Sequence, residues 1–237
     1  MIDILSKEDY SLGKKQEIRA KRLRTQKVKQ GLTIFAIVLI AALFVAFLIY
    51  PSLKPAAELV IPASVGTFDS NDMTLGDPTA PLTVEVFSDY QCPACGYYVQ
   101  DTEMKFIKDY VSTGKVYYIF RPFNFLGQES ILAAEAAYCA MEQGNFWDFH
   151  DVLYHNMPGE NTGTLDDARL TRYATSIGLN EKDFKACLQS NRNLAQVEVD
   201  NTYADTSGVT GTPSFKIGDQ VVGYKDLIAT VNAALAK

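Results

Sequence analysis

The sequence predicts an α/β fold preceded by one transmembrane helix, and the order of its patterns carries this prediction. An apolar run comes first, and it is followed by a strand-like, a helical and a second strand-like stretch. A block of helical patterns occupies about 128–206, and two short strands and a helix close the chain. The expected order is therefore β-α-β, an all-helical insertion, then β-β-α.

The first two strands flank a helix. Residues 82–87 alternate and are rich in β-branched side chains, which is typical of a buried strand. A helix is expected over 93–113, closed by Gly114, and a second strand over 115–120, ended by Pro122. Since a helical crossover joins strands that run in the same direction, these two strands should be parallel.

The block that follows contains four helical patterns. One is alanine-rich (130–144), one is aromatic (146–155), one has apolar residues at i, i+3, i+4 and i+7 (170–177), and one begins near Asn180. Phe146, Trp147 and Phe149 are expected in the core of this block rather than in a substrate groove. After it, SFKIG and QVVG form a hairpin at Gly218-Asp219, and a helix follows over 225–236.

The apolar run at 31–50 has no charged residue in 20 positions and would span about 30 Å as a helix. Eight basic residues and one acid stand just before it, which favours a cytoplasmic N-terminus. A cleaved signal peptide is the alternative, but the run is long and no Ala-x-Ala site follows. We expect a basic cytoplasmic segment (1–30), an uncleaved anchor (31–50), a linker (51–70) and an extracytoplasmic domain (71–237).

Charge is divided in the same way. Residues 1–30 carry a balance of +5 and the remaining 207 residues one of −11. A basic N-terminal segment and an acidic remainder indicate two compartments rather than a nucleic-acid-binding surface. The expected partner of the basic segment is therefore the bilayer. All four cysteines lie beyond the anchor, on the side where disulfides persist.

Two of these cysteines form the motif Cys92-Pro93-Ala94-Cys95, which suits a redox pair, half a metal site or a structural crosslink. Cys92 precedes the predicted helix, where backbone N–H groups and the helix dipole stabilise a thiolate. Cys95 lies one turn inside and can reach back to it, while Pro93 suits the first helical turn. This geometry makes Cys92 the nucleophile and Cys95 the resolving thiol.

A metal site would need more ligands than the sequence offers. His150 and His155 are five positions apart, which puts them on different helix faces, and a second CxxC is absent. We expect both histidines to be partly buried or solvated, and we expect no metal and no cofactor.

The other two cysteines, Cys139 and Cys187, each fall in a helix of the insertion. Two buried thiols are possible, but on the oxidising side of a membrane a structural disulfide is the favoured interpretation. It would close a loop of about 48 residues and stabilise the fold by a few kcal/mol.

Together with this order of elements, FSDYQCPAC and GVTGTPSF resemble the thioredoxin superfamily, and within it the DsbA-type thiol:disulfide oxidoreductases in a membrane-anchored form. The resemblance covers about 78–237. It implies a thioredoxin fold with a helical insertion, a cis peptide bond before Pro213, and pairing of the Thr212 backbone with an extended substrate peptide.

The resemblance also bears on Glu85, an unusual carboxylate in the middle of the first strand. The family carries an acidic residue near this position. If Glu85 is buried under the cysteines, a raised pKa would let it relay the Cys95 proton. The alternative is that its face of the sheet reaches solvent.

The resemblance implies an enzyme that introduces disulfides into reduced or unfolded exported proteins. A membrane partner of the DsbB or vitamin K epoxide reductase type would reoxidise it. An extracytoplasmic reductase or isomerase, a non-catalytic peptide-binding chaperone and a copper carrier are the alternatives. Ala94 stands where strongly oxidising relatives often carry histidine, so we expect a Cys92 pKa below that of free cysteine, yet less depressed than in those relatives.

Overall fold

The computed structural model describes residues 2–53, 59–62 and 72–237, and the chain divides into two compact units after residue 58. The first unit contains one helix, α1 (Ile2–Leu53). The linker expected at 51–70 lies mostly outside the described residues; its described parts are the end of α1 and residues 59–62.

Helix α1 contains the apolar stretch Lys29–Ile49, which has a mean hydropathy of 3.1 and is not buried against other parts of the protein. This stretch is long and apolar enough to cross a bilayer. The same composition, close to the N-terminus, also fits a signal sequence. The helix is therefore compatible with a single-pass anchor or with a signal sequence.

The second unit is built on a five-stranded sheet with strand order β1-β3-β2-β4-β5. The strands are β1 (Thr74–Leu75), β2 (Leu82–Ser88), β3 (Val116–Pro122), β4 (Ser214–Ile217) and β5 (Gln220–Gly223). Strands β2 and β3 are parallel, as the crossover predicts, and the other pairs are antiparallel. Strand β1 was not expected, because two residues are too short to show an alternating pattern.

The crossover between β2 and β3 is a helical run from Pro93 to Val111. It consists of α2 (Pro93–Tyr98), the π-helical segment η1 (Val99–Glu103), α3 (Met104–Phe106) and a second π-helical segment, η2 (Ile107–Val111). The chain then turns at Gly114, whose φ of +70° lies in the left-handed region that glycine adopts without strain.

Five helices connect β3 to β4. They are α4 (Gln128–Met141), α5 (Phe146–His155), α6 (Asp167–Ser176), α7 (Glu181–Gln189) and α8 (Leu194–Thr206). Asn180 caps α7 by accepting a hydrogen bond from the Asp183 N–H. Phe146, Trp147 and Phe149 are buried in the main core, which confirms their structural interpretation.

The C-terminal part forms the predicted hairpin and helix. Strands β4 and β5 pair across a turn at Gly218, whose φ is +60°. A 3₁₀ turn, η3 (Tyr224–Asp226), then leads into α9 (Leu227–Leu235).

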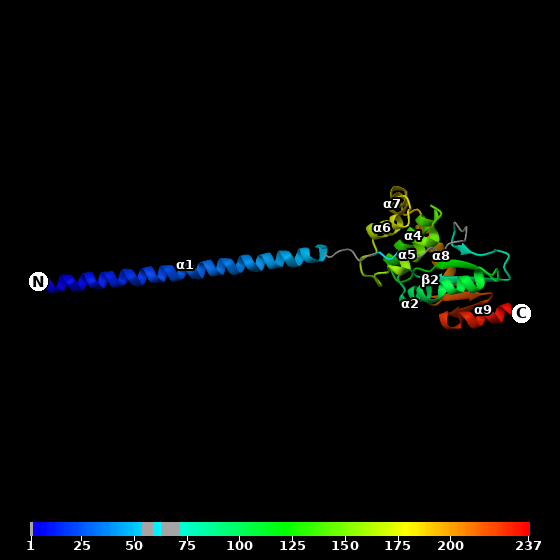
Figure 1. Ribbon diagram of the computed structural model, residues 1–237, viewed down its shortest axis with the longest axis horizontal. Helices are drawn as coiled ribbons and strands as arrows, with labels where there is room; N and C mark the ends of the chain where they lie inside the picture. Colours follow the sequence, from blue (N-terminus) through cyan, green and yellow to red (C-terminus); the bar gives the residue numbers. More distant parts are fainter. Residues whose placement is uncertain (1, 54–58, 63–71) are drawn as a thin grey trace. The chain divides into compact units, whose positions relative to one another are not determined.

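The sheet separates two apolar layers, with α2 and α9 on one side and α8 on the other (Figure 1). Val84 and Val86 of β2 pack in the main core, which also contains the active-site helix and α9. Phe87 points the other way, into a smaller cluster with Ala204 of α8. This alternation along β2 decides which of its side chains face the cysteines.

Candidate active site

Cys92 and Cys95 lie at the start of the helix that follows β2. Cys92 is the residue that precedes α2, with an extended backbone (φ −73°, ψ 119°), and Pro93 begins the helix. Both cysteines are free thiols, so the structure shows the reduced form of the pair. Cys92 is 9% exposed and Cys95 is fully buried. An incoming sulfur therefore reaches Cys92 and not Cys95.

The surroundings of Cys92 stabilise its thiolate and lower its pKa from 9.0 to about 6. The largest contribution is a hydrogen bond from the Cys95 thiol, and burial opposes it. Thr212 and the backbone N–H groups of Cys95 and Ala94 lower the pKa of Cys92 further. The helix start that the sequence predicted thus contributes, but the neighbouring thiol contributes more.

Cys95 behaves in the opposite way. Burial raises its pKa well above 9.0, and its interaction with Cys92 raises it further. At neutral pH the pair therefore consists of one thiolate, on Cys92, and one thiol, on Cys95. This division suits a nucleophile and a resolving thiol.

The loop before β4 faces this pair. The peptide bond between Thr212 and Pro213 is cis, as the resemblance implied. The Cys92 Sγ lies 3.5 Å from the Thr212 carbonyl oxygen, although the two residues are 120 positions apart. The structure therefore brings together Cys92, Cys95, Thr212 and Pro213.

Asp89 organises the turn that leads into Cys92, a role the sequence analysis missed. Its carboxylate accepts hydrogen bonds from the Gln91 N–H (2.8 Å), the Ser130 hydroxyl (2.6 Å) and the N–H groups of Phe125 and Leu126 (3.1 Å each). Burial raises its pKa, and these bonds act against that rise. The sequence cue for this role was an Asp just before the cysteine motif, because an Asp side chain often accepts a hydrogen bond from the N–H two residues later in an Asx turn.

The structure does not bring Glu85 to the cysteines, so the expectation that it lies under them is wrong. Side chains alternate along a strand, and Glu85 shares its face with Phe87, on the side of α8. Its carboxylate lies 2.7 Å from Arg121 Nε and accepts a hydrogen bond from the Tyr203 hydroxyl at 2.9 Å. Lys216 Nζ lies 3.7 Å away, so Glu85 belongs to an ion-pair cluster.

His150 is completely buried, contrary to the expectation for the two histidines. It belongs to a buried cluster with Glu103 and Asp151. One ring nitrogen of His150 and one carboxylate oxygen from each acid lie within 4.8 Å of one another. Asp151 Oδ1 lies 3.0 Å from Nδ1, and Glu103 Oε2 lies 3.7 Å from Nε2. Burial lowers the pKa of His150, but the two carboxylates outweigh it and the net shift is upward. Nδ1 forms a hydrogen bond with Asp151, whereas Nε2 faces Glu103 at ion-pair distance and has no hydrogen-bond partner among the described residues, so we interpret the cluster as a buried ion pair.

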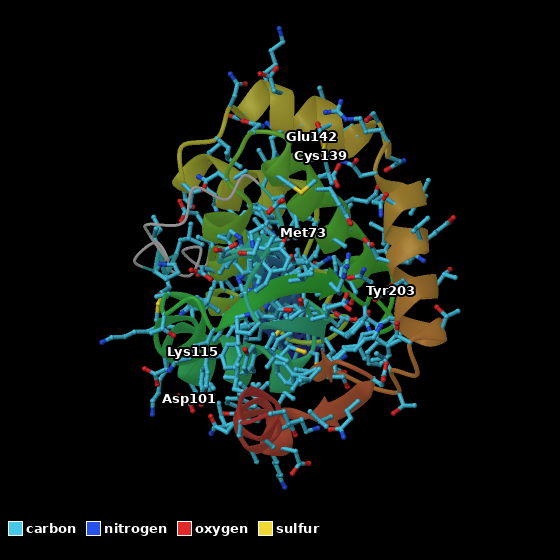
Figure 2. The ribbon with its side chains drawn as sticks, turned by 90° about the vertical axis from the view of Figure 1, so that its right-hand side faces the viewer. Met73, Asp101, Lys115, Cys139, Glu142 and Tyr203 are labelled. Carbon is cyan, nitrogen blue, oxygen red and sulfur yellow. A yellow bond between two sulfur atoms is a disulfide. The ribbon has the colours of Figure 1, made fainter. Side chains whose placement is uncertain are left out.

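The second cysteine pair is joined in the structure. A disulfide links Cys139 of α4 to Cys187 of α7, with 48 positions between them (Figure 2). The Asn193 side-chain N–H₂ group lies 3.4 Å from the Cys187 sulfur, and Glu142 forms an ion pair with Arg192 beside it. This bond ties two helices of the insertion together, away from the residues that surround Cys92.

Changing Ala94 to histidine should lower the Cys92 pKa below its value of about 6. Alanine offers the thiolate only a backbone N–H, whereas an imidazolium adds a positive charge close to the sulfur. We expect a decrease of about one pH unit. The measurement is the rate of iodoacetamide alkylation of Cys92 against pH.

Ala94→Leu is the matched control for this substitution, because leucine adds bulk without charge. Its alkylation profile should stay near that of the unaltered protein. An unchanged midpoint in Ala94→His would contradict our account of this position.

The chain is similar to several known proteins. A family model described as thioredoxin matches residues 69–237. Disulfide bond formation protein D of Bacillus subtilis is 29% identical over 168 residues, which cover 68% of this chain and 76% of that protein. The solved structure of oxidised BdbD from Bacillus subtilis superposes with a TM-score of 0.65 at 28% identity and covers 74% of this chain and 100% of that one.

A different kind of protein is also similar to part of this chain. The sodium/proton antiporter NhaA 3 of Salinispora tropica is 34% identical over 166 residues, which are 69% of this chain but 24% of the antiporter. The chain thus spans about a quarter of the length of that relative. The family model covers well over half of the chain, and the solved relative shares the fold over 74% of it. The chain belongs to the thioredoxin family and, within it, to the DsbA-type thiol:disulfide oxidoreductases.

Proposed function

We propose that this protein is a membrane-tethered thiol:disulfide oxidoreductase that introduces disulfides into exported proteins through Cys92 and Cys95. The observation that carries the proposal is the division of the pair into an accessible thiolate and a buried thiol. The pKa of Cys92 is about 6, whereas that of Cys95 is raised well above 9.0. Relatives named for disulfide bond formation support the same direction of electron flow.

The lowered pKa favours oxidation of the substrate for a thermodynamic reason. A thiolate exists only in the reduced pair, so every contact that stabilises it stabilises the reduced state relative to the disulfide. Because the folded-state pKa of Cys92 lies below that of a free thiol, this stabilisation is fully present above the free-thiol pKa and is lost as pH falls through about 6. Relative to a free dithiol, the pair should therefore become more oxidising as the pH rises from about 6 to about 9.

Substrate binding is assigned to the loop opposite the cysteines. The Thr212 carbonyl oxygen lies 3.5 Å from the Cys92 sulfur, so its backbone lies at the point of attack. We propose that an extended peptide pairs with the Thr212 backbone and places its cysteine over Cys92. Pro213 keeps this loop free of one backbone N–H and shapes its approach.

The N-terminal charges support a proposal for the topology. We propose that residues 1–30 remain in the cytoplasm, that 31–50 span the membrane and that the domain at 71–237 acts on the far side. Reduced or unfolded exported proteins would be the substrates. A membrane partner of the DsbB or vitamin K epoxide reductase type would return the pair to its disulfide form.

Substrate trapping tests this proposal. Changing Cys95 to alanine removes the resolving thiol, so mixed disulfides between Cys92 and client proteins should accumulate. They are detected as bands on non-reducing gels that disappear on reduction, and mass spectrometry identifies the clients. The double variant Cys92→Ala/Cys95→Ala is the control and should trap nothing.

The equilibrium redox potential tests the direction. An oxidase should be clearly more oxidising than thioredoxin, whose potential is about −270 mV. A potential close to that of thioredoxin would favour the reductase, and a failure of Cys95→Ala to trap any protein would count against disulfide transfer as such.

A further inference from the structure

The cysteine-facing side of β2 ends in a hydroxyl group instead of the expected carboxylate. Ser88 follows Val84 and Val86 on the same face of the strand and is 1% exposed. Its hydroxyl is one of the groups that lower the pKa of the Cys95 thiol, against the rise that burial causes. The group on the cysteine-facing side is therefore a neutral hydroxyl. Glu85 lies on the opposite face of the same strand.

A second hydroxyl supports the first. The Ser88 Oγ lies 2.7 Å from the Tyr154 hydroxyl oxygen, and both side chains are buried. Tyr154 comes from α5, 66 positions further along the chain. Its ring packs against Tyr90 and His150, with centroid separations of 5.1 and 4.9 Å, so it has little freedom to move.

The two hydroxyls can form an ordered chain, because each of them carries a single proton. If Tyr154 donates to the Ser88 oxygen, the only proton of Ser88 is free to point at the Cys95 sulfur. Burial raises the pKa of Tyr154 well above 10.0, and its proximity to Cys95 raises the pKa further, so the phenol keeps its proton and remains a donor.

We propose that Ser88 is a catalytic residue that donates a hydrogen bond to Cys95 as this sulfur leaves as a thiolate, and that Tyr154 is a positioning residue that acts through Ser88. This inference rests on the proposed disulfide exchange. It supplies what the exchange lacks at this buried position, which is a means of accepting negative charge away from water.

The step is balanced. A substrate thiolate attacks the Cys92 sulfur of the oxidised pair, forming a disulfide between substrate and Cys92. The Cys92–Cys95 bond breaks, and Cys95 takes the electron pair. The substrate sulfur is oxidised and Cys95 is reduced. The proton that the substrate thiol gave up to solvent is returned by solvent to Cys95, while Ser88 holds the thiolate until it arrives.

Thr212 also lowers the pKa of Cys95, and it lowers the pKa of Cys92 as well. Loss of Ser88 should therefore slow the step without stopping it.

The test measures the first reduction step with reduced glutathione as the probe. The oxidised full-length protein is mixed with glutathione and quenched with acid, and the mixed disulfide on Cys92 is counted by mass spectrometry. Ser88→Ala should slow this step about tenfold, since a hydrogen bond to a developing charge is lost. Tyr154→Phe should slow it about threefold, because Ser88 keeps its proton but loses its orientation.

The double variant separates the two roles. Ser88→Ala/Tyr154→Phe should be no slower than Ser88→Ala alone, because Tyr154 has nothing left to orient. Rates that multiply would overturn the positioning role of Tyr154. Tyr173→Phe is the matched control: it also removes a buried phenol, but this one donates to the Asn156 carbonyl oxygen at 2.8 Å. Its rate should equal that of the unaltered protein.

A second readout reports on Cys95 without any exchange. In the Cys92→Ala background, the Cys95 ¹³Cβ chemical shift is followed against pH. The midpoint should rise in Ser88→Ala and Tyr154→Phe and stay unchanged in Tyr173→Phe. Glutathione rates within twofold of the unaltered protein, or an equal slowing in Tyr173→Phe, would overturn the proposal. Neither measurement uses a client protein, so a failure here is distinct from a failure to trap substrates.

Discussion

Replacing Cys92 by serine should abolish disulfide transfer while leaving the fold intact. Serine has nearly the same shape, and Cys92 is only 9% exposed, so the packing around it should change little. Its hydroxyl, however, is neutral at every pH in which the protein is folded and cannot form a disulfide. The stabilised thiolate, with a pKa of about 6, is lost entirely.

The measurement is the oxidation of a reduced test protein by the full chain, followed through free thiols. Transfer by Cys92→Ser should fall to the rate without enzyme. Cys139→Ala/Cys187→Ala is the control, because it removes two cysteines but leaves the pair at the helix start. Unchanged activity of Cys92→Ser in the cell would favour the peptide-binding chaperone over the enzyme.

Removing the Cys139–Cys187 disulfide should lower the free energy of unfolding by about 4 kcal/mol. This estimate follows from the 48 positions between the two cysteines, because a crosslink that closes a long loop restricts the unfolded chain strongly. The bond joins α4 to α7, so its loss should loosen the insertion first. Urea unfolding of Cys139→Ala/Cys187→Ala in detergent, followed by circular dichroism, measures the effect.

Cys92→Ala/Cys95→Ala is the matched control for this experiment. It also removes two cysteines, but the crosslink between them closes a loop of a few residues and restricts the unfolded chain much less. If both double variants lost the same stability, chain restriction by the Cys139–Cys187 bond would not be the cause. A loss of transfer activity in Cys139→Ala/Cys187→Ala at a temperature where it remains folded would show that this disulfide is more than structural.

Much of the fold was predictable because its signals are local. The alternation of residues 82–87 and the glycine at 114 bounded a strand and a helix that the structure places within a residue or two. The positions of Cys92, Pro93 and Cys95 relative to that helix followed from the same boundary. Strand β1 was not predicted because two residues are too few to show an alternating pattern, and its pairing with β3 depends on the rest of the sheet.

In the candidate site, too, only the features that depend on neighbouring residues could be predicted from the sequence. That Cys92 would be the thiolate could be argued from its place before the helix, yet its largest stabilising contact is the Cys95 thiol. The assignment of Glu85 failed because a shift of one position along a strand reverses the face of the sheet, and no local pattern showed which face covers the cysteines. Asp89 was overlooked because its partners near 125 and at Ser130 are distant in the chain.

Local patterns were enough to predict the order of the elements apart from β1 and α8, the apolar N-terminal stretch and the redox motif at a helix start, since each depends on residues close together in the chain. Only tertiary packing could show that Ser88 forms a hydrogen bond with Tyr154, that Glu85 lies with Arg121, and that Thr212 faces Cys92. These contacts join segments 36 to 120 positions apart. Their geometry depends on how the sheet pleats and how the helices pack, which local sequence patterns do not encode.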